Sequence, residues 1–417
     1  TSSGASTYGG AVTLTVTVAA ADATVPTGTV SLSDGTAGIG TCTLSGGTCT
    51  LTSSALAAGT HAITARFPAS ARYAASVSGS LSQAVAPAST TTTVVSSNAA
   101  STYGGSVTFT VTVATANGTT ASGSVSVLDG AASIGTCTLA SGSCSVTTST
   151  LGAGGHPMSA RYAGDANHAS STSAQIDQTV AQAATTTSVA SSSLSSAFGA
   201  SVTFTVTVSP AAAGGSATVY DGANALGTCT LVSGVCSISS AALTAGSHAI
   251  GARYAGTANY ATSAAAAIAQ TVAQATTTTT LVSSSPSATF GVPVTYTVTV
   301  AAANGTTPTG TATLLDGTAG VGTCTLAAGR CDVTTGALIS GTHALSARYA
   351  GDANHLGSTS ATLTQAIVSP TTTVVTSSGA STYGGAVTLT VTVAAADATV
   401  PTGTVSLSDG TAGIGTC

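Results

Sequence analysis

The chain carries a strict alternation of apolar and polar residues that returns at regular intervals. In its first clear example, threonines separate the apolar residues Val12, Leu14, Val16 and Val18. A period of two places successive side chains on opposite faces of a strand, so the apolar set faces a core and the threonines face away from it. Val and Thr are β-branched and fit a half-buried sheet. The 49 glycines are scattered and no 3.6-residue apolar stripe is present, so the pattern predicts strands rather than helices.

The same alternation recurs along the whole chain, which indicates an internal repeat. Its later copies span 107–113, 202–208, 294–300 and 387–393. The tripeptide Gly-Thr-Cys follows each copy and ends at Cys42, Cys137, Cys229, Cys324 and Cys417, at steps of 95, 92, 95 and 93 residues. Residues 1–42 and 376–417 are identical, so four different repeats form one higher-order unit and a fifth begins as the first did. A fixed period of this kind decides the fold class before any single motif does.

Each repeat reads as seven short strands separated by turn residues. Asp-Gly pairs begin at Asp34, Asp129, Asp221, Asp316 and Asp409 and are typical of tight turns. Seven short strands with a turn every 8–12 residues predict a β-sandwich, and therefore an all-β tandem array. We expect boundaries at 1–87, 88–183, 184–275, 276–369 and 370–417, with the first strand of the first repeat incomplete and the last repeat a truncated copy of the first. The links between repeats are short, which favours an extended rod.

Several motifs resemble those of a known family. The pattern TLxxGxCxxxxxxL, the step AGxH, the segment ARYAGDANH and the closing QTV are similar to the tandem bacterial Ig-like repeats of large extracellular and cell-surface proteins. The resemblance covers the whole chain and implies Ig-like sandwiches that serve as stalks, extenders or fibre subunits. It says little about a ligand, because one fold hosts many roles. The chain departs from the common pattern by carrying a cysteine pair in each repeat.

The cysteines predict disulfides. They are spaced seven residues apart in each full repeat, with SGG or SGS at the bend in the first two, so we expect them to lie directly opposite each other across a hairpin whose loop has two or four residues. Cys42 alternates in step with Leu44 and Cys49 with Leu51, so both thiols should face the core. The predicted pairs are Cys42–Cys49, Cys137–Cys144, Cys229–Cys236 and Cys324–Cys331, and the partner of Cys417 would lie seven residues further on. Zinc is the alternative, but no repeat brings four ligands together. Disulfides imply an oxidising, extracellular or cell-surface location.

The composition narrows the range of partners. Charged residues make up 4% of the chain, all as 6 Arg and 11 Asp, and the net charge is −5. No basic patch is available for nucleic acid, and no run of 18 apolar residues predicts a transmembrane segment. Without lysine, the chain cannot form the Lys–Asn isopeptide bonds found in many surface Ig-like domains, so the disulfides are the predicted covalent links.

The candidate chemistry is sparse, and we expect no enzyme, no catalytic residue and no cofactor. One His recurs in a Gly-rich turn, where capping of the turn or packing on a neighbouring repeat is favoured over ligand binding: His61, His156, His248 and His343. One Arg per repeat precedes an aromatic residue, and we expect it to pair with an Asp of its own repeat or a backbone carbonyl, with surface stacking or binding as the alternative: Arg66, Arg161, Arg253 and Arg348.

Two kinds of loop offer candidate sites. The GDANH loops place Asp165 near Asn167 and Asp352 near Asn354, which are candidate Ca²⁺ ligands, although two ligands per loop make a turn the favoured interpretation. Asn117 and Asn304 begin Asn-Gly-Thr sequons and are candidate glycosylation sites, or turn residues.

The surface favours a structural role. Thr-rich, nearly uncharged faces lack the Lys and other charges that usually protect sheet edges, so they offer little resistance to packing against copies of themselves. The sequence therefore predicts the structural subunit of an extracellular filament or surface fibre that self-associates. The alternatives are the rigid stalk of a bacterial surface adhesin, kept soluble by glycans, and a carbohydrate- or ice-binding array that uses the Thr faces.

Overall fold

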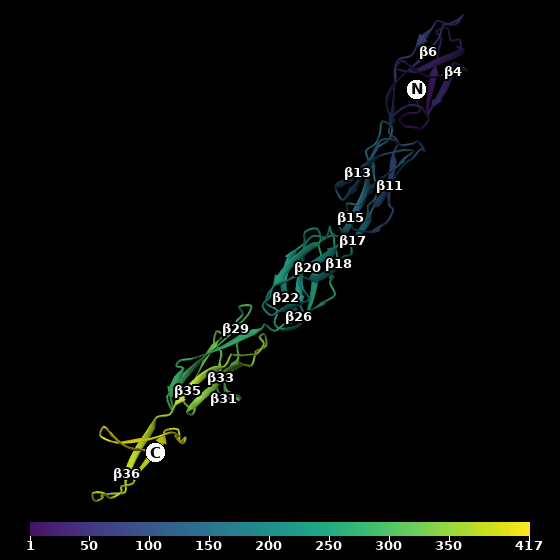
Figure 1. Ribbon diagram of the computed structural model, residues 1–417. Helices are drawn as coiled ribbons and strands as arrows, with labels where there is room; N and C mark the ends of the chain where they lie inside the picture. Colours follow the sequence, from purple (N-terminus) through teal and green to yellow (C-terminus); the bar gives the residue numbers. More distant parts are fainter. The chain divides into compact units, whose positions relative to one another are not determined.

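The computed structural model describes all residues 1–417 and contains strands but no helix, which confirms the all-β class (Figure 1). The chain forms two compact units. Unit 1 comprises Thr1–Thr185 with Gly256–Thr262, and unit 2 comprises Thr186–Ala255 with Ser263–Cys417.

Both sheets of the second repeat are complete. A three-stranded sheet has the order β14-β11-β9, and a six-stranded sheet has the order β10-β17-β15-β12-β13 with β16 beside β15. The strands are β9 Thr90–Ser96, β10 Ala100–Thr102, β11 Val107–Thr115, β12 Ser124–Asp129, β13 Ala132–Thr138, β14 Ser143–Thr148, β15 Gly154–Tyr162, β16 Ser171–Thr172 and β17 Ile176–Ala181.

The core lies between these two sheets. Phe109 and Val111 of β11 pack in one apolar cluster with Val127, Met158 and Tyr162 of the other sheet. All five side chains are fully buried. The alternate residues of β11 are threonines that point away from the core, as the period of two requires. The face of β11 that the sequence predicts to be buried is therefore the buried face in the structure. The second repeat as a whole is an Ig-like sandwich.

The third and fourth repeats have the same sheet orders. The third contains β18 Thr186–Ser191, β19 Ser195–Ala197, β20 Val202–Ser209, β21 Ser216–Asp221, β22 Asn224–Thr230, β23 Val235–Ser240, β24 Gly246–Tyr254, β25 Ser263–Ala264 and β26 Ile268–Ala273. The fourth contains β27 Thr277–Ser283, β28 Ser287–Thr289, β29 Val294–Ala302, β30 Thr311–Asp316, β31 Ala319–Thr325, β32 Arg330–Thr335, β33 Gly341–Tyr349, β34 Ser358–Thr359 and β35 Leu363–Val368. Figure 1 shows β29, β31, β33 and β35 gathered in one body of unit 2.

The first repeat and the C-terminal segment contain fewer strands. The first has β1 Ser6–Thr7, β2 Val12–Thr17, β3 Gly28–Asp34, β4 Ala37–Leu44, β5 Thr48–Ser53, β6 Gly59–Phe67, β7 Ser76–Val77 and β8 Leu81–Ala86. The C-terminal segment has β36 Thr371–Ser377, β37 Leu389–Ala395, β38 Ser406–Asp409 and β39 Ala412–Thr416, in two two-stranded sheets.

The structure adds two short strands to the seven that the sequence predicts in a complete repeat. The predicted first strand continues past a bend as β10, which leaves the small sheet and pairs in parallel with β17 of the large one. The second addition, β16, pairs two residues with the end of β15. Segments of two or three residues are too short to show an alternating pattern, so no sequence signal marks them.

Candidate functional site

The four predicted cysteine pairs are joined in the structure. The Cα atoms of each pair lie 5.7–5.8 Å apart, within the usual range for a disulfide. Cys42 and Cys49 are each 8% exposed and belong to the core of the first repeat. Cys417 is free and exposed.

The disulfides connect two sheets, which differs from the expected pairing of neighbours within one hairpin. Cys137 lies in β13, at the edge of the large sheet, and Cys144 lies in β14, at the edge of the small sheet. Between them only Ala140 and Ser143 pair, around a two-residue turn in which Ser141 and Gly142 both have positive φ. This pairing places the cysteines two positions out of the expected register. The two strands then diverge into opposite sheets, so each disulfide links the two layers of a sandwich.

A His–Asp pair recurs in all four repeats. The Asp of the Asp-Gly turn lies 27 residues before the His, and its Oδ2 is 2.6–2.7 Å from His Nδ1, in the pairs Asp34–His61, Asp129–His156, Asp221–His248 and Asp316–His343. The other ring nitrogen, Nε2, lies 2.7–2.8 Å from a backbone carbonyl four residues earlier in the chain. A carbonyl and a carboxylate accept hydrogen bonds, so this arrangement suits an imidazolium that donates from both nitrogens. The Asp-Gly pairs thus do more than form the predicted turns, and the constant 27-residue spacing between Asp and His is the sequence signal for this second role.

The protonation of these histidines follows from their partners. The Ala57 carbonyl and then the Asp34 carboxylate raise the pKa of His61 above its usual value of 6.5. Burial alone would lower the pKa of His156, but the Gly152 carbonyl and the Asp129 carboxylate outweigh it and raise the pKa. His248 and His343 share that balance, and their pKa values are also raised. Each histidine therefore bonds a carbonyl of its own Gly-rich turn, as the predicted capping role requires, and also joins that turn to the Asp-Gly turn.

In the GDANH loops, the aspartates that are candidate Ca²⁺ ligands accept hydrogen bonds from groups of the protein itself. Asp165 Oδ2 accepts the backbone N–H and the hydroxyl of Ser122, and Oδ1 accepts the Asn167 N–H and lies 2.8 Å from His168 Nδ1. Burial raises the pKa of Asp165, but these hydrogen bonds lower it more, so the net pKa is held below its usual value of 3.8. Asp352 has the same environment in the fourth repeat, and its pKa is lowered in the same way. No group of three or more His, Cys, Asp or Glu residues in the chain has the arrangement of a metal site.

The remaining loop candidates contact the preceding repeat. Asn167 Oδ1 accepts the Ala58 N–H at 2.9 Å within unit 1, and Asn354 Oδ1 accepts the Ala245 N–H at 2.9 Å within unit 2. The side-chain amides of the sequon residues Asn117 and Asn304 donate to the carbonyl oxygens of Tyr8 and Phe198. The asparagines among the candidate Ca²⁺ ligands and the candidate glycosylation residues thus occupy the junctions between consecutive repeats.

The recurring arginines are exposed and make no ion pair. This differs from the expected pairing with an Asp. Arg253 instead lies over the ring of Tyr220, 5.2 Å from its centroid. The ion pair that an arginine does make joins Arg72 to Asp22 at 3.8 Å, with both side chains well exposed.

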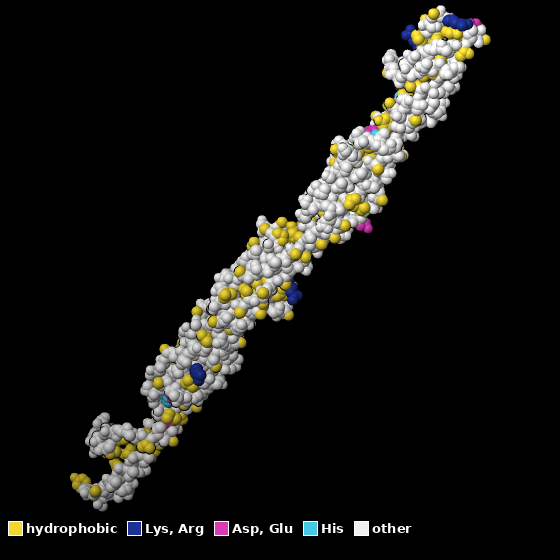
Figure 2. All heavy atoms as spheres, turned by 90° about the vertical axis from the view of Figure 1, so that its right-hand side faces the viewer, with side chains coloured by type: hydrophobic (Ala, Val, Ile, Leu, Met, Phe, Trp, Pro, Cys, Tyr) yellow, Lys and Arg dark blue, Asp and Glu magenta, His cyan; other side chains and the backbone are white.

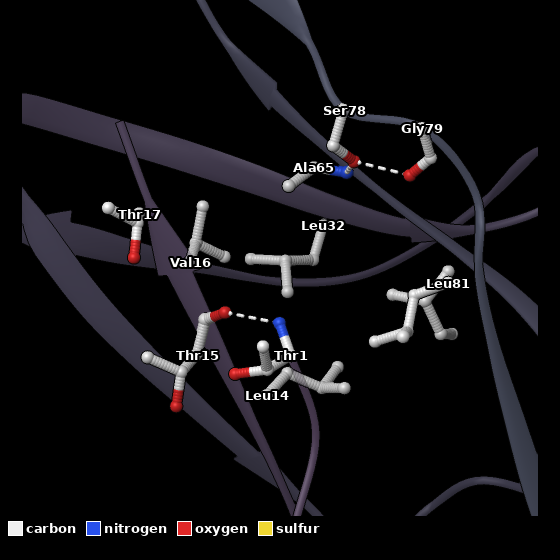
Figure 3. Close-up of a pocket in the computed structure, with 11 residues that line it drawn as sticks. Thr1, Leu14, Thr15, Val16, Thr17, Leu32, Ala65, Ser78, Gly79 and Leu81 are labelled. Carbon is white, nitrogen blue, oxygen red and sulfur yellow. Dashed lines mark hydrogen bonds between the residues drawn. The ribbon is translucent and has the colours of Figure 1, made fainter. Parts of the chain in front are cut away.

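A groove of about 280 Å³ opens beside β2 in the first repeat. Figure 3 shows Leu14, Val16, Leu32 and Leu81 around it, with the Thr1 amino group bonded to the Thr15 carbonyl oxygen at 2.9 Å. In the second repeat, β9 pairs with the corresponding edge of β11 and buries Val94. In the C-terminal segment, β36 pairs with β37 along the same sequence that forms β2. The groove is therefore the position that a first strand fills in the other repeats.

Sequence comparison identifies the family. The pattern of the bacterial Ig-like domain (group 3) family matches residues 1–86, 93–181, 188–273 and 281–368. These four stretches make up most of the chain, which therefore belongs to this family of tandem Ig-like repeats. No curated protein sequence matches the chain.

The chain also resembles solved structures built from several Ig-like domains. Immunoglobulin domains 1–5 of Sidekick-1 are 12% identical, with 87% of this chain and 78% of that chain covered and a TM-score of 0.29. The D1–D4 ectodomain fragment of ICAM-5 is 13% identical, covering 87% and 97%, with a TM-score of 0.32. The Escherichia coli adhesin FdeC is 15% identical, covering 67% and 96%, with a TM-score of 0.25. The structure contains no helix with the length and apolar character needed to cross a membrane.

Proposed function

We propose that this chain is a structural, non-enzymatic segment of an extracellular filament or surface fibre, in which neighbouring chains pack through uncharged sheet faces. The observation that carries the proposal is the outer face of the sheet β14-β11-β9. Its three central rows, in register, contain the residues Ser143, Thr112 and Thr93, then Ser145, Thr110 and Val95, then Thr147 and Thr108. None of these side chains is charged, and the exposed Val95 adds an apolar contact surface.

The wider surface supports the same proposal. Figure 2 shows a face on which few Arg, Asp or His side chains interrupt the hydrophobic and uncharged atoms. Soluble sheet proteins ordinarily prevent edge-to-edge association with charges. The four disulfides support an oxidising compartment, because thiols remain reduced in the cytosol. An extracellular or cell-surface location follows from the proposal.

A stalk that holds a separate adhesive domain away from a cell is the second candidate. It is favoured by the hydrogen bonds between consecutive repeats, which limit their relative motion: Ala58 to Asn167 in unit 1 and Ala245 to Asn354 in unit 2. A stalk needs such junctions but needs no contact between chains. The domain boundaries that the sequence predicts serve either role.

Electron microscopy of the native material separates the two candidates. Ordered fibres containing several chains would support the filament, and single thin strands that end in a distinct particle would support the stalk. Thr110→Arg places a charge in the middle of the proposed packing face, and we expect it to weaken association. Ala174→Arg adds the same charge at an exposed loop position and serves as the control. Association that is equal in both variants and the parent chain would contradict packing through this face.

A further inference from the structure

Two of the repeats carry a set of residues that joins them to the repeat before. In the second repeat, the Asn117 side-chain amide donates to the Tyr8 carbonyl oxygen of the first repeat, and Asn117 Oδ1 accepts from the Thr119 hydroxyl at 2.7 Å. The same hydroxyl lies 2.8 Å from Nε2 of His168, whose Nδ1 contacts Asp165. The His168 ring is 4% exposed and packs edge-on against the Tyr8 ring, with 5.4 Å between centroids.

The fourth repeat reproduces these contacts on the third. The Asn304 amide donates to the Phe198 carbonyl oxygen, and Asn304 Oδ1 accepts from Thr306 at 2.7 Å. Thr306 lies 2.8 Å from Nε2 of His355, which is 3% exposed and packs edge-on against Phe198 at 5.4 Å. The same hydrogen-bond network therefore occurs twice, and each copy contacts the preceding repeat. This recurrence indicates a specific interface between repeats.

The two halves of this set occur together or not at all. The third repeat has Thr257 and Tyr260 in place of the Asp and the His, and its loop after β20 contains no Asn-Gly-Thr. Instead, Tyr260 packs edge-on against Tyr103 within unit 1. The first repeat lacks both halves as well. The hydrogen bond from a loop amide to the loop Asn is nevertheless kept, because Asn259 Oδ1 accepts the Ala153 N–H at 2.8 Å.

The turn of the preceding repeat that is contacted also differs between junctions with and without this set of residues. Gly9 and Gly199 have φ of +78° and +81° and lie directly under the set: a Cβ on Gly9 would be 2.5 Å from Asn117 Nδ2, and one on Gly199 would be 2.8 Å from Asn304 Nδ2. Gly104 has nearly the same backbone, with φ of +82°, but a Cβ there would meet nothing within 4 Å. Glycine is thus required at positions 9 and 199 because the neighbouring repeat approaches closely. At position 104 glycine is favoured only by the left-handed backbone of the turn.

We infer that Asn-Gly-Thr together with Asp-Ala-Asn-His forms an interdomain latch, a surface on one repeat that docks onto the aromatic-Gly turn of the repeat before it. The latch is defined by Asn117, Thr119, Asp165 and His168, and by Asn304, Thr306, Asp352 and His355. It makes the first and second repeats one docked pair and the third and fourth another. The sequon asparagines have their function in this contact, and a glycan on either amide would prevent it.

Hydrogen exchange of the full oxidised chain, read at single amides, tests the latch. The Ala58 N–H bonds across a latched junction and the Ala153 N–H makes the equivalent bond to Asn259 without a latch, so Ala58 should show the higher protection factor. Gly9→Ala should reduce the protection of Ala58 by roughly fivefold, the effect of losing one ordinary hydrogen bond. Gly104→Ala adds a β-carbon at a residue with the same left-handed backbone but no neighbour, and it should leave the protection of Ala58 unchanged.

A second variant covers the case in which Gly9→Ala disturbs the first repeat itself, which would be seen as faster exchange in β2 and β6. Asn117→Asp lies in an exposed loop of the second repeat and removes the amide donor. It should lower the protection of Ala58 while the amides of β11 and β15 exchange as before. If Ala58 keeps its full protection in Asn117→Asp, or if Ala58 and Ala153 are equally protected in the parent chain, the latch does not hold the junction.

Discussion

At the scale of the residue, more than half of the aspartates of this chain lie in local pairs with histidine. All six histidines lie within 2.6–2.8 Å of an aspartate, and together they engage six of the eleven aspartates. Four of these pairs connect the Asp-Gly turn to the strand that follows the disulfide in each repeat. These paired aspartates therefore fix loops, while the exposed faces remain nearly uncharged.

The four recurring pairs predict that the chain is more stable at mildly acidic pH than at alkaline pH. The folded pKa of His61, His156, His248 and His343 lies above 6.5. A raised folded pKa contributes stability that is fully present below about pH 6.5 and is lost as the pH rises through the folded value. We expect a higher apparent melting temperature at pH 5.5 than at pH 8.5. His156→Gln should reduce this difference, and a melting temperature that increases between pH 6 and pH 8.5 would contradict the assignment.

Two buried tyrosines make opposite predictions for the same substitution. The Tyr254 hydroxyl donates to the Gly214 carbonyl oxygen at 2.8 Å, so Tyr254→Phe should lower the unfolding free energy by about 1–2 kcal/mol. The Tyr296 hydroxyl is buried without a partner, and its equivalents in β11 and β20 are Phe109 and Phe204. Tyr296→Phe should therefore be neutral or stabilising. Denaturant titration of both variants checks this, and an equal loss in the two would mean that the Tyr254 hydrogen bond has no separate effect.

At the scale of the element, the long strands were predictable and the short ones were not. Four apolar residues at a period of two determine which face of β11 is buried, because a shift by one residue would expose all of them. The strands β10 and β16 lack any such pattern, since they pair through backbone atoms over two or three residues. The cysteine spacing predicts the pairs, but the divergence of β13 and β14 into two sheets depends on tertiary packing that the local sequence does not show.

The inter-sheet position of the disulfides predicts a local loss of stability when one is removed. Replacing Cys229 and Cys236 by Ser removes the disulfide between two residues that are seven positions apart. In the chain-entropy model, opening a loop of this size should cost the third repeat about 2–3 kcal/mol of unfolding free energy. The loss should be seen as faster exchange in β22 and β23, the edge strands that the disulfide joins. The strands β13 and β14 of the second repeat keep their own disulfide and serve as the internal control. Equal exchange in β22 and β23 before and after the substitution would show that the disulfide does not restrain the sheets.

At the scale of the whole molecule, the motifs shared by all repeats determine the fold, and residues present in only some repeats determine how the junctions differ. The family and the all-β class follow from motifs that are present in every repeat, such as the alternation in β11 and its equivalents. The junction contacts depend on Asn117 and His168, which are 51 residues apart in sequence and meet only through the sandwich. Their roles as sequon and turn residue were the plausible local interpretations. The structure was needed to show that both reach the preceding repeat.

The scarcity of charge predicts that association between chains, if it builds a fibre as proposed, is insensitive to ionic strength. Only 4% of the residues are charged, and the net charge is −5 over 417 residues. Raising NaCl from about 0.02 to about 0.3 M shortens the Debye length from roughly 20 Å to roughly 6 Å, which screens exposed ion pairs but leaves contacts between Thr, Ser and Val side chains intact. Light scattering at constant protein concentration should therefore change little across this range. Fibres that dissolve as salt is added would show instead that ion pairs between neighbouring chains hold them together, and the uncharged faces would then not be the packing surface.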